Sequence, residues 1–432
     1  MSTTTVHHTI DPIIAQVTVP PSKSIANRAL ICAALAGGES EIVGLAPGDD
    51  TSAMLDCLRA LGVPVGLSRR NGVDHAIVAG TGGALPPGEI TLNTRLAGTT
   101  SRFITAVAAL GPGPYRIDGD PPLRARPMGP LHDSLHALGA VIEPGEQWGH
   151  LPVTVSGPVG GADALMMPGD VSSQYVTALM LIAPLIRDGM RLGLSTELVS
   201  RPYVEITKSV MESFGATGVE ISGRRIHVDE SAYIPRRYVV EPDASSASYP
   251  LAAAAVAGGS VAVPGLGTSS LQGDVAFVEV LERMGCLVTA GTHDTVVMRR
   301  RDEPLQGIDV DMADISDLVP TVAVVATQAV SPTRITGVGF IRAKESDRLG
   351  DLASELRTLG ADVVVDDDGL TITPGDPLRG GRVSTHHDHR LAMAFGVLGL
   401  VVEGVEIADP EVVTKSWPGY WTMLERLPEG RR

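Results

Sequence analysis

The sequence contains few aromatic residues and no excess of positive charge. Phenylalanine, tryptophan and tyrosine make up 3% of the 432 residues, too few to supply stacking surfaces for nucleic-acid bases. The formal net charge of −16 at pH 7 argues further against nucleic acid and anionic membranes as partners. Basic residues that converge on one site would therefore be a local exception in an acidic protein.

Cysteines and long apolar runs are also scarce. The three cysteines, Cys32, Cys57 and Cys286, show neither a disulfide framework nor a zinc-binding spacing, which indicates buried thiols in a reducing compartment. The first eleven residues lack the basic and apolar segments of a secretory signal. The longest apolar run, residues 391–402, is too short to span a bilayer. We expect a cytoplasmic protein.

Glycine is abundant, and one pattern that ends in glycine recurs along the chain. An amphipathic segment leads to an apolar residue, a glycine and a β-rich segment, such as Ala140–Ile142 or Asp362–Val365. Glycine suits the left-handed residue that closes a helix. The pattern occurs five times, at intervals of 70 to 77 residues, with glycines Gly62, Gly139, Gly215, Gly285 and Gly360.

A sixth, degenerate copy of the pattern is expected at Met423–Leu427, cut short by Pro428. A chain of this length exceeds one ordinary core, so we expect two halves of three units, each unit with two helices and about four strands in mixed sheets. The halves are expected to meet near Tyr238–Ala244. The stretch Gly265–Thr268 lacks the third glycine of a dinucleotide fingerprint, and the chain has no P-loop motif.

The stretch Arg342–Arg348 has five charged residues among seven. Apolar residues repeat at helical spacing directly after it, from Leu349 to Leu359, which places the charges at the start of an amphipathic helix. Helix N-termini attract anions, and Glu345 and Asp347 could move protons. In an arbitrary protein such a stretch is more often a solvated helix start with local ion pairs.

Similar stretches recur, each with basic, acidic or hydroxyl side chains at an expected helix start or loop. Singly, each is explained by a helix cap, a tight turn or a solvated loop; jointly, they indicate a cleft for more than one anionic group. The His-rich stretch leaves a metal site as a minor possibility, since adjacent histidines do not easily face one ion. The stretches are Pro20–Arg28, Leu96–Arg102, Arg124–Met128, Gly169–Tyr175, Ser200–Tyr203, Asp243–Ser246, Asp311–Asp317, His386–Arg390 and Thr414–Pro418.

The order of these stretches resembles the 3-phosphoshikimate 1-carboxyvinyltransferase family, also called the enolpyruvylshikimate-phosphate (EPSP) synthases. The resemblance runs from Val17 to about Leu427. The motifs that carry it are Pro21–Arg28, Leu96–Thr99, Arg126–Met128, Ser172–Tyr175, Ser200–Tyr203, Gln272–Asp274, Lys344–Arg348 and Asp388–Arg390.

This resemblance implies an α/β fold, a two-domain inside-out barrel of six βαβαββ repeats, three per domain. The first domain would comprise residues 1–20 and 244–432, the second residues 21–243, and the active site would lie in the cleft between them. The implied reaction transfers the enolpyruvyl group of phosphoenolpyruvate to the 5-hydroxyl of shikimate 3-phosphate, without metal or organic cofactor. We expect these two small molecules as partners, no nucleic acid or membrane, and a monomer.

The resemblance also implies the site residues. Asp317 would be the base for the attacking hydroxyl, and Glu345 and Lys23 are candidates for delivering protons, with the roles not divided between them. Shikimate 3-phosphate would be bound by Lys23, Ser24, Arg28, Ser172, Ser173, Gln174, Ser200, Tyr203, Asp317 and Lys344. Phosphoenolpyruvate would be bound by Lys23, Gly98, Arg126, Gln174, Arg348, Arg390 and Lys415.

The chain departs from the family at two positions, Leu96 and Phe340, where relatives often have asparagine, so substrate contacts there are left open. One alternative function is enolpyruvyl transfer to UDP-N-acetylglucosamine. The enzyme that does so typically carries a catalytic cysteine in the loop corresponding to residues 119–127, which has none here. Another alternative is a non-catalytic anion-binding protein on the same scaffold, against which the acid and base residues Asp317, Glu345 and Lys23 argue.

Overall fold

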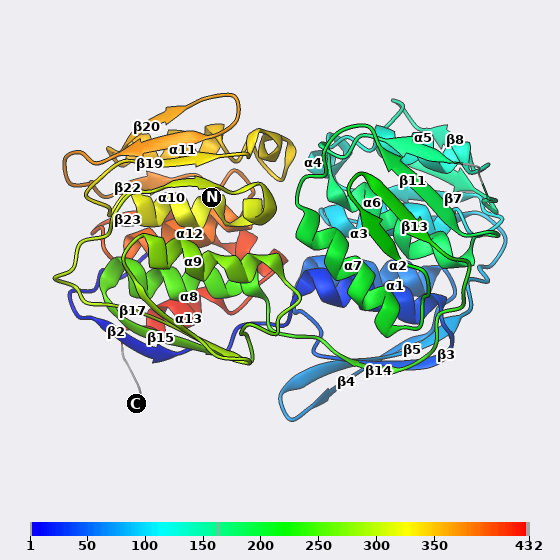
Figure 1. The fold of residues 1–432 in the computed structure, drawn as a ribbon, viewed down its shortest axis with the longest axis horizontal. Coiled ribbons are helices and arrows are strands. Elements are labelled where there is room, and N and C mark those ends of the chain that lie inside the picture. Colours follow the sequence, from blue (N-terminus) through cyan, green and yellow to red (C-terminus); the bar gives the residue numbers. More distant parts are fainter. Residues whose placement is uncertain (1, 162–163, 429–432) are drawn as a thin grey trace. The chain divides into compact units, whose positions relative to one another are not determined.

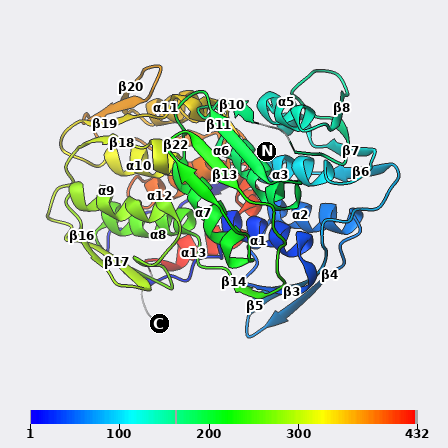
Figure 2. The same cartoon turned by 45° about the vertical axis from the view of Figure 1, so that its right-hand side comes forward.

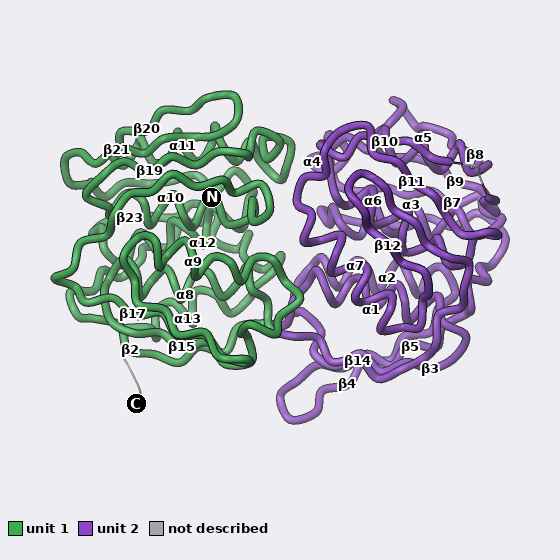
Figure 3. Tube along the Cα trace, viewed as in Figure 1, with its two compact units in different colours: residues 1–20, 242–432 green, residues 21–241 purple. Residues whose placement is uncertain are grey.

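The computed structural model describes residues 2–161 and 164–428 and divides into two compact units (Figure 1, Figure 3). Unit 1 comprises Met1–Pro20 and Pro242–Arg432, and unit 2 comprises Pro21–Glu241. The second boundary between these two units falls between Glu241 and Pro242. Of the first expected domain, residues 1 and 429–432 lie outside the described part of the chain.

Unit 2 is built of three four-stranded sheets of one design, in which a parallel pair is extended by two antiparallel strands. The middle repeat has the sheet order β6-β7-β9-β8, which is the βαβαββ arrangement expected from the family resemblance. Its elements are β6 (Ile90–Asn93), α3 (Gly98–Ala108), β7 (Tyr115–Asp118), α4 (Pro121–Arg124), α5 (Gly129–Ala137), β8 (Val141–Pro144) and β9 (Val153–Ser156).

The other two repeats of unit 2 follow the same order. In the first repeat, β14 comes from the far end of the unit and pairs in parallel with β3. That repeat consists of β14 (Arg237–Val239), α1 (Lys23–Leu35), β3 (Gly37–Val43), α2 (Asp49–Ala60), β4 (Val65–Arg70) and β5 (Val73–Thr81). The third consists of β10 (Leu165–Met167), α6 (Ser173–Ile182), η1 (Ala183–Leu185), β11 (Met190–Leu194), α7 (Arg201–Ser213), β12 (Glu220–Ser222) and β13 (Arg225–Val228).

Unit 1 repeats the design, and its first two sheets again have four strands. The first repeat consists of β2 (Ile13–Gln16), α8 (Ala244–Ala257), β15 (Gly259–Pro264), η2 (Gly273–Ala276), α9 (Phe277–Arg283), β16 (Leu287–Ala290) and β17 (Asp294–Arg299). The second consists of β18 (Asp309–Asp311), η3 (Ala313–Leu318), α10 (Val319–Ala326), β19 (Thr333–Thr336), η4 (Gly339–Ala343), α11 (Gly350–Thr358), β20 (Asp362–Val365) and β21 (Leu370–Thr373).

The sixth repeat is shorter, as the sequence indicated. Its sheet has the order β1-β23-β22, and the N-terminal strand β1 pairs antiparallel with β23. Its elements are β22 (Gly381–Val383), α12 (His389–Gly399), β23 (Val405–Ala408), η5 (Pro410–Lys415), α13 (Tyr420–Arg426) and β1 (Thr3–Thr5). The prediction of six α/β repeats, three in each half, is confirmed.

Helices occupy the interior of each unit and sheets its outside, so the fold is an inside-out barrel (Figure 1, Figure 2). In unit 1, α8, α10 and α12 contact one another, and every residue of the three is buried. In unit 2, α1, α3 and α6 form a similar nearly buried group. The alanine-rich sequences suit this arrangement, because small side chains let buried helices approach closely. In the described part of the chain, no helix has the length and apolar character needed to cross a bilayer.

The five predicted helix ends are confirmed. Each of the five glycines has a φ between 81° and 102°, and its N–H donates to the carbonyl three residues earlier. The N–H of the following residue donates to the carbonyl five residues earlier, as in Ala361 to Leu356. This pair of bonds is the Schellman motif, which satisfies carbonyls that the helix end would otherwise leave unpaired. All three cysteines are free and buried, as expected.

Candidate active site

Arg348 is the centre of a buried charge network in unit 1. Its side chain is 1% exposed, and it donates to three carboxylates. Nη1 lies 2.8 Å from Oδ1 of Asp317, Nη2 lies 2.7 Å from Oε2 of Glu345, and Nε lies 2.7 Å from Oδ2 of Asp388. Three carboxylates around one guanidinium leave a surplus of negative charge that further cations must balance.

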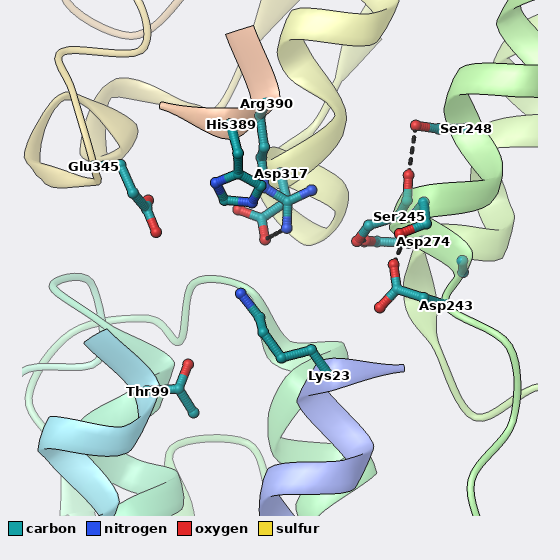
Figure 4. A network of polar contacts seen from close by, with 12 residues as sticks. Lys23, Thr99, Asp243, Ser245, Ser248, Asp274, Asp317, Glu345, His389 and Arg390 are labelled. Carbon is teal, nitrogen blue, oxygen red and sulfur yellow. Dashed lines mark hydrogen bonds and ion pairs between the residues drawn. The ribbon is translucent and has the colours of Figure 1, made fainter. Parts of the chain in front are cut away.

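Arg390 and Lys415 supply this balance. Nη2 of Arg390 lies 2.6 Å from Oδ2 of Asp317, and Nζ of Lys415 lies 3.0 Å from Oε1 of Glu345. Asp317 and Glu345 each therefore bridge two cations, through different oxygens. Figure 4 shows Asp317 and Arg390 side by side.

The members of this network come from η3, η5, the start of α12 and the loop between η4 and α11, which holds Glu345 and Arg348. Asp317 lies in η3, whose backbone departs from helical geometry at Ile315. Asp388 is the N-cap of α12 and accepts from the amide of Arg390 at 2.9 Å. Lys415 is the last residue of η5. The cap thus fixes the carboxylate that holds Arg348, and the same helix start presents Arg390.

The charged stretch 342–348 lies directly before α11, as the sequence predicted. The stretch covers the last two residues of η4 and the loop that follows, and α11 begins at Gly350. Oδ1 of Asp347 accepts from the amides of Leu349 at 3.2 Å and Gly350 at 2.9 Å. The anion bound at this helix start is therefore the chain's own Asp347, which also pairs with Arg342 at 3.1 Å.

Two carboxyl groups in and beside the network have pKa values shifted in opposite directions. Burial raises the pKa of Asp317, but the guanidiniums of Arg390 and Arg348 and the ammonium of Lys344 outweigh this and hold it well below its usual range. Nearby Asp274 behaves in the opposite way: burial, together with the charge of Asp317, raises its pKa to about 7. The hydroxyl of Ser245, at the start of α8, donates to Asp274 (Figure 4).

In unit 2, Lys23 is held by a carboxylate that the sequence analysis did not find. Lys23 is the first residue of α1, after the N-cap Ser22. Its Nζ lies 2.8 Å from Oδ2 of Asp50, whose side chain is 3% exposed in the first turn of α2. The hydroxyl of Thr100, in α3, donates to the carbonyl of Asp50 at 3.1 Å. Three helix starts of unit 2 therefore meet at this ion pair.

Arg28 is buried one turn further along α1. It donates to the Thr207 hydroxyl at 2.8 Å and to the carbonyls of Ser24 at 2.7 Å and Tyr203 at 3.1 Å. Its guanidinium also lies over the rings of Phe103 and Tyr203. Burial lowers the pKa of Arg28 to about 10, because neutral acceptors compensate only part of the lost hydration. These contacts bring Arg28, Ser24 and Tyr203 together.

Gly98 opens α3 directly beside Arg126. A Cβ at Gly98 would lie 2.5 Å from Nη1 of Arg126, so only glycine lets that guanidinium lie against the helix start. The Gln174 side chain donates to the hydroxyl of Thr99, next to Gly98, at 3.3 Å. These contacts bring Gly98, Arg126 and Gln174 into one region of unit 2.

The chain matches, over residues 7–424, the family model described as EPSP synthase (3-phosphoshikimate 1-carboxyvinyltransferase). The chain belongs to the EPSP synthase family. It is 45% identical over 415 residues to the 3-phosphoshikimate 1-carboxyvinyltransferase of Methanoculleus marisnigri, with 96% of each chain covered. It is 40% identical to that of Nostoc sp., with 96% of this chain and 97% of the relative covered.

A solved structure agrees with this membership. The EPSP synthase of Acinetobacter baumannii superimposes with a TM-score of 0.79 at 25% identity, covering 98% of this chain and 97% of that one. The inside-out fold described above is therefore the fold of an EPSP synthase. The assignment of individual substrate contacts to this family member stays a prediction.

Of the remaining predicted residues, three serines lie at helix starts of unit 2, and Lys344 lies in unit 1. Ser172 is the N-cap of α6 and accepts from the amide of Gln174 at 3.3 Å, and Ser173 follows as the first residue of the helix. Ser200 is the N-cap residue of α7, with a left-handed φ of 53°. Lys344 follows η4 as its C-cap residue, with its Nζ over the ring of Phe340.

Two partners were missed by the sequence analysis, and the signals for them differ. Asp388 had a signal, because an aspartate directly before an expected helix is a typical N-cap. Asp50 had none that pointed to Lys23, since 27 residues separate the two. Within residues 2–161 and 164–428, no group of three or more His, Cys, Asp or Glu side chains is placed to hold a metal ion, and this includes the His-rich stretch. Instead, Nε2 of His386 lies 2.7 Å from Oε1 of Glu355.

Proposed function

We propose that this chain transfers the enolpyruvyl group of phosphoenolpyruvate to the 5-hydroxyl of shikimate 3-phosphate, forming 5-enolpyruvylshikimate 3-phosphate and phosphate. This places it in the shikimate pathway to aromatic amino acids. Membership of the EPSP synthase family supports the reaction. The observation that carries the proposal in the structure is the unit 1 network, in which the predicted base Asp317 lies against two predicted phosphoenolpyruvate ligands, Arg348 and Arg390.

Phosphoenolpyruvate needs cations for its carboxylate and phosphate. In the proposal, Arg348, Arg390 and Lys415 of unit 1 and Lys23, Gly98, Arg126 and Gln174 of unit 2 provide this environment. Planar guanidiniums suit both groups, because two parallel N–H donors match two oxygens. For shikimate 3-phosphate, we propose Lys23, Ser24, Arg28, Ser172, Ser173, Gln174, Ser200 and Tyr203, with Asp317 and Lys344 on the ring hydroxyls.

The proton transfers follow from the reaction. The 5-hydroxyl oxygen bonds to C2 of phosphoenolpyruvate as Asp317 takes its proton, and the methylene carbon takes a proton from Glu345 or Lys23. The tetrahedral intermediate then returns a proton from its methyl group as the C–O bond to phosphate breaks. Asp317 is a weak base while Arg390 and Arg348 hold its pKa low. Anionic phosphoenolpyruvate at these arginines would raise that pKa, so the base is strengthened when its substrate is in place.

The domain assignment belongs to the same proposal. We propose that the active site lies in the cleft between a domain of residues 1–20 and 244–432 and a domain of residues 21–243. The chain is proposed to act as a monomer in the cytoplasm. Size-exclusion chromatography with light scattering would test the monomer, and a mass near twice 45.0 kDa would contradict it.

The reaction is tested by phosphate release from phosphoenolpyruvate. We expect release to require shikimate 3-phosphate and not to occur with UDP-N-acetylglucosamine. Asp317→Ala should lower kcat by about 10²–10⁴-fold, the usual contribution of a general base. Asp314→Ala is the matched control, since Asp314 is exposed on the same 3-10 helix and is not assigned a role. Unchanged turnover in Asp317→Ala would remove Asp317 from the mechanism, and release without shikimate 3-phosphate would contradict the proposed acceptor.

A further inference from the structure

Phe340 lies beside Lys344, which the proposed function assigns to shikimate 3-phosphate. Nζ of Lys344 stands over the Phe340 ring, 5.6 Å from its centroid. At this distance an ammonium is attracted by the negative face of an aromatic ring. The two residues belong to one short turn of unit 1, because Phe340 lies in η4 and Lys344 is its C-terminal cap residue.

The turn that carries the ring is fixed within unit 1. Val338 and Ile341, on either side of Phe340, are both 0% exposed, and Phe340 itself packs against the same core. The amide of Val338 donates to the carbonyl of Asp368 at 2.8 Å, and the amide of Lys344 donates to the carbonyl of Ile341 at 3.3 Å. The backbone at both ends is thus held, so the ring is a rigid surface for a flexible lysine side chain.

An aromatic ring differs from a carboxylate as a partner for lysine. Lys415 and Lys23 lie against Glu345 and Asp50, whose negative charges would repel an incoming phosphate. A ring attracts an ammonium without adding net negative charge. The Phe340 ring therefore attracts the Lys344 ammonium without adding negative charge, and the charge of Lys344 reaches as far as Asp317.

We propose that Phe340 is a positioning residue for shikimate 3-phosphate, with its ring holding the Lys344 ammonium where it contacts that substrate. The inference rests on the proposed function, in which Lys344 binds a ring hydroxyl. The asparagine that the family resemblance leads one to expect at this position has no aromatic face. This chain would thus replace an amide at the site with an aromatic support for the neighbouring lysine.

The first test compares variants that differ only in the ring. Phe340→Leu keeps an apolar side chain against the core but removes the aromatic ring. Phe340→Tyr keeps both the apolar contact and the aromatic ring. We expect Phe340→Leu to raise the KM for shikimate 3-phosphate about two- to fivefold, with a smaller effect on kcat and on the KM for phosphoenolpyruvate. Phe340→Tyr should retain the wild-type KM. A Phe340→Tyr enzyme that behaves like Phe340→Leu would overturn the inference.

A double-mutant cycle separates positioning of Lys344 from simple packing. In a Lys344→Met background, Phe340→Leu should cause no further rise in the dissociation constant for shikimate 3-phosphate, measured by calorimetry. An equal rise in both backgrounds would mean that Phe340 acts through packing and would overturn the inference. An active wild type with an unchanged KM in Phe340→Leu would overturn this inference alone. An inactive wild type would overturn the proposed function and this inference with it.

Discussion

Arg28 is a cation buried mainly among neutral groups, 2% exposed. Its hydrogen bonds go to hydroxyl and carbonyl oxygens, one of them the hydroxyl of Thr177 at 3.4 Å. A buried charge that neutral groups stabilise only in part gains more from an incoming anion than a solvated one, because it has little hydration left to lose. At the scale of a single residue, this environment supports the proposed binding of shikimate 3-phosphate by Arg28.

This arrangement predicts that substrate affinity and stability respond differently to Arg28→Met. The groups around Arg28 can still pair, since the hydroxyl of Thr207 donates to the carbonyl of Tyr203 at 2.8 Å and lies 3.0 Å from that of Thr177. We expect shikimate 3-phosphate to bind about 10- to 100-fold more weakly, the worth of one hydrogen bond to a charged group, with Tm little changed or raised. Calorimetric titration and thermal unfolding would measure both, and wild-type affinity would contradict the role of Arg28.

The raised pKa of Asp274 predicts that the stability of the protein depends on pH. Its native pKa of about 7 lies above the ordinary value of 3.8, so between these pH values it stays protonated in the folded protein and ionised in the unfolded one. Its contribution to stability is therefore fully present below pH 3.8 and is lost as pH rises through 7. Asp274→Asn cannot lose a proton, so its stability relative to wild type should rise by on the order of 2–4 kcal/mol between pH 4 and 8. Denaturant unfolding across this range would measure the difference, and a difference independent of pH would contradict the burial of a titrating carboxyl.

At the scale of elements, the helix ends were the most predictable feature. An apolar residue followed by glycine stops a helix through local backbone geometry alone, so Leu359–Gly360 carries its information within a few residues. The start of α11 could not be found in the same way. The sequence shows a cluster of charges before an apolar repeat, but which of them turns towards the helix amides depends on the loop conformation, and it is Asp347.

The left-handed glycine that ends each of these helices predicts that Gly360→Ala destabilises the protein. Gly360 has a φ of 95°, and a Cβ there would have no atom within 4 Å, so backbone strain is the only penalty. We expect a loss of about 1–2 kcal/mol in the free energy of unfolding. Gly375→Ala is the matched control, because its Cβ would also enter open space but its φ is ordinary. Denaturant titration should separate the two variants, and an equal effect of both would contradict the strain argument.

At the scale of the whole molecule, sheets are completed by strands from distant parts of the chain. β1 closes the sixth repeat by pairing Thr3–Thr5 with Glu406–Ala408, and β14 closes the first repeat of unit 2 by pairing with β3. Neither pairing has a local signal, since three-residue strands such as Arg237–Val239 show almost no periodicity. The number of repeats was therefore predictable from the spacing of the glycines. The pairing of β1 in the sixth repeat and of β14 in the first repeat of unit 2 was not.

The proposed function requires residues of both units to bind the same pair of substrates, which makes a prediction for hydrogen exchange. With saturating shikimate 3-phosphate and phosphoenolpyruvate, amides at the start of α1 in unit 2 and in residues 344–349 of unit 1 should both be protected. Where an amide exchanges only when the site opens, its exchange rate should fall by up to about 100-fold at ligand concentrations near 100 times Kd. Peptides covering β12 and β20 are the controls, because no residue of either strand is assigned to a substrate. Protection confined to the peptides of one unit would mean that one half of the assigned residues does not contact substrate, and it would contradict a site shared between the two units.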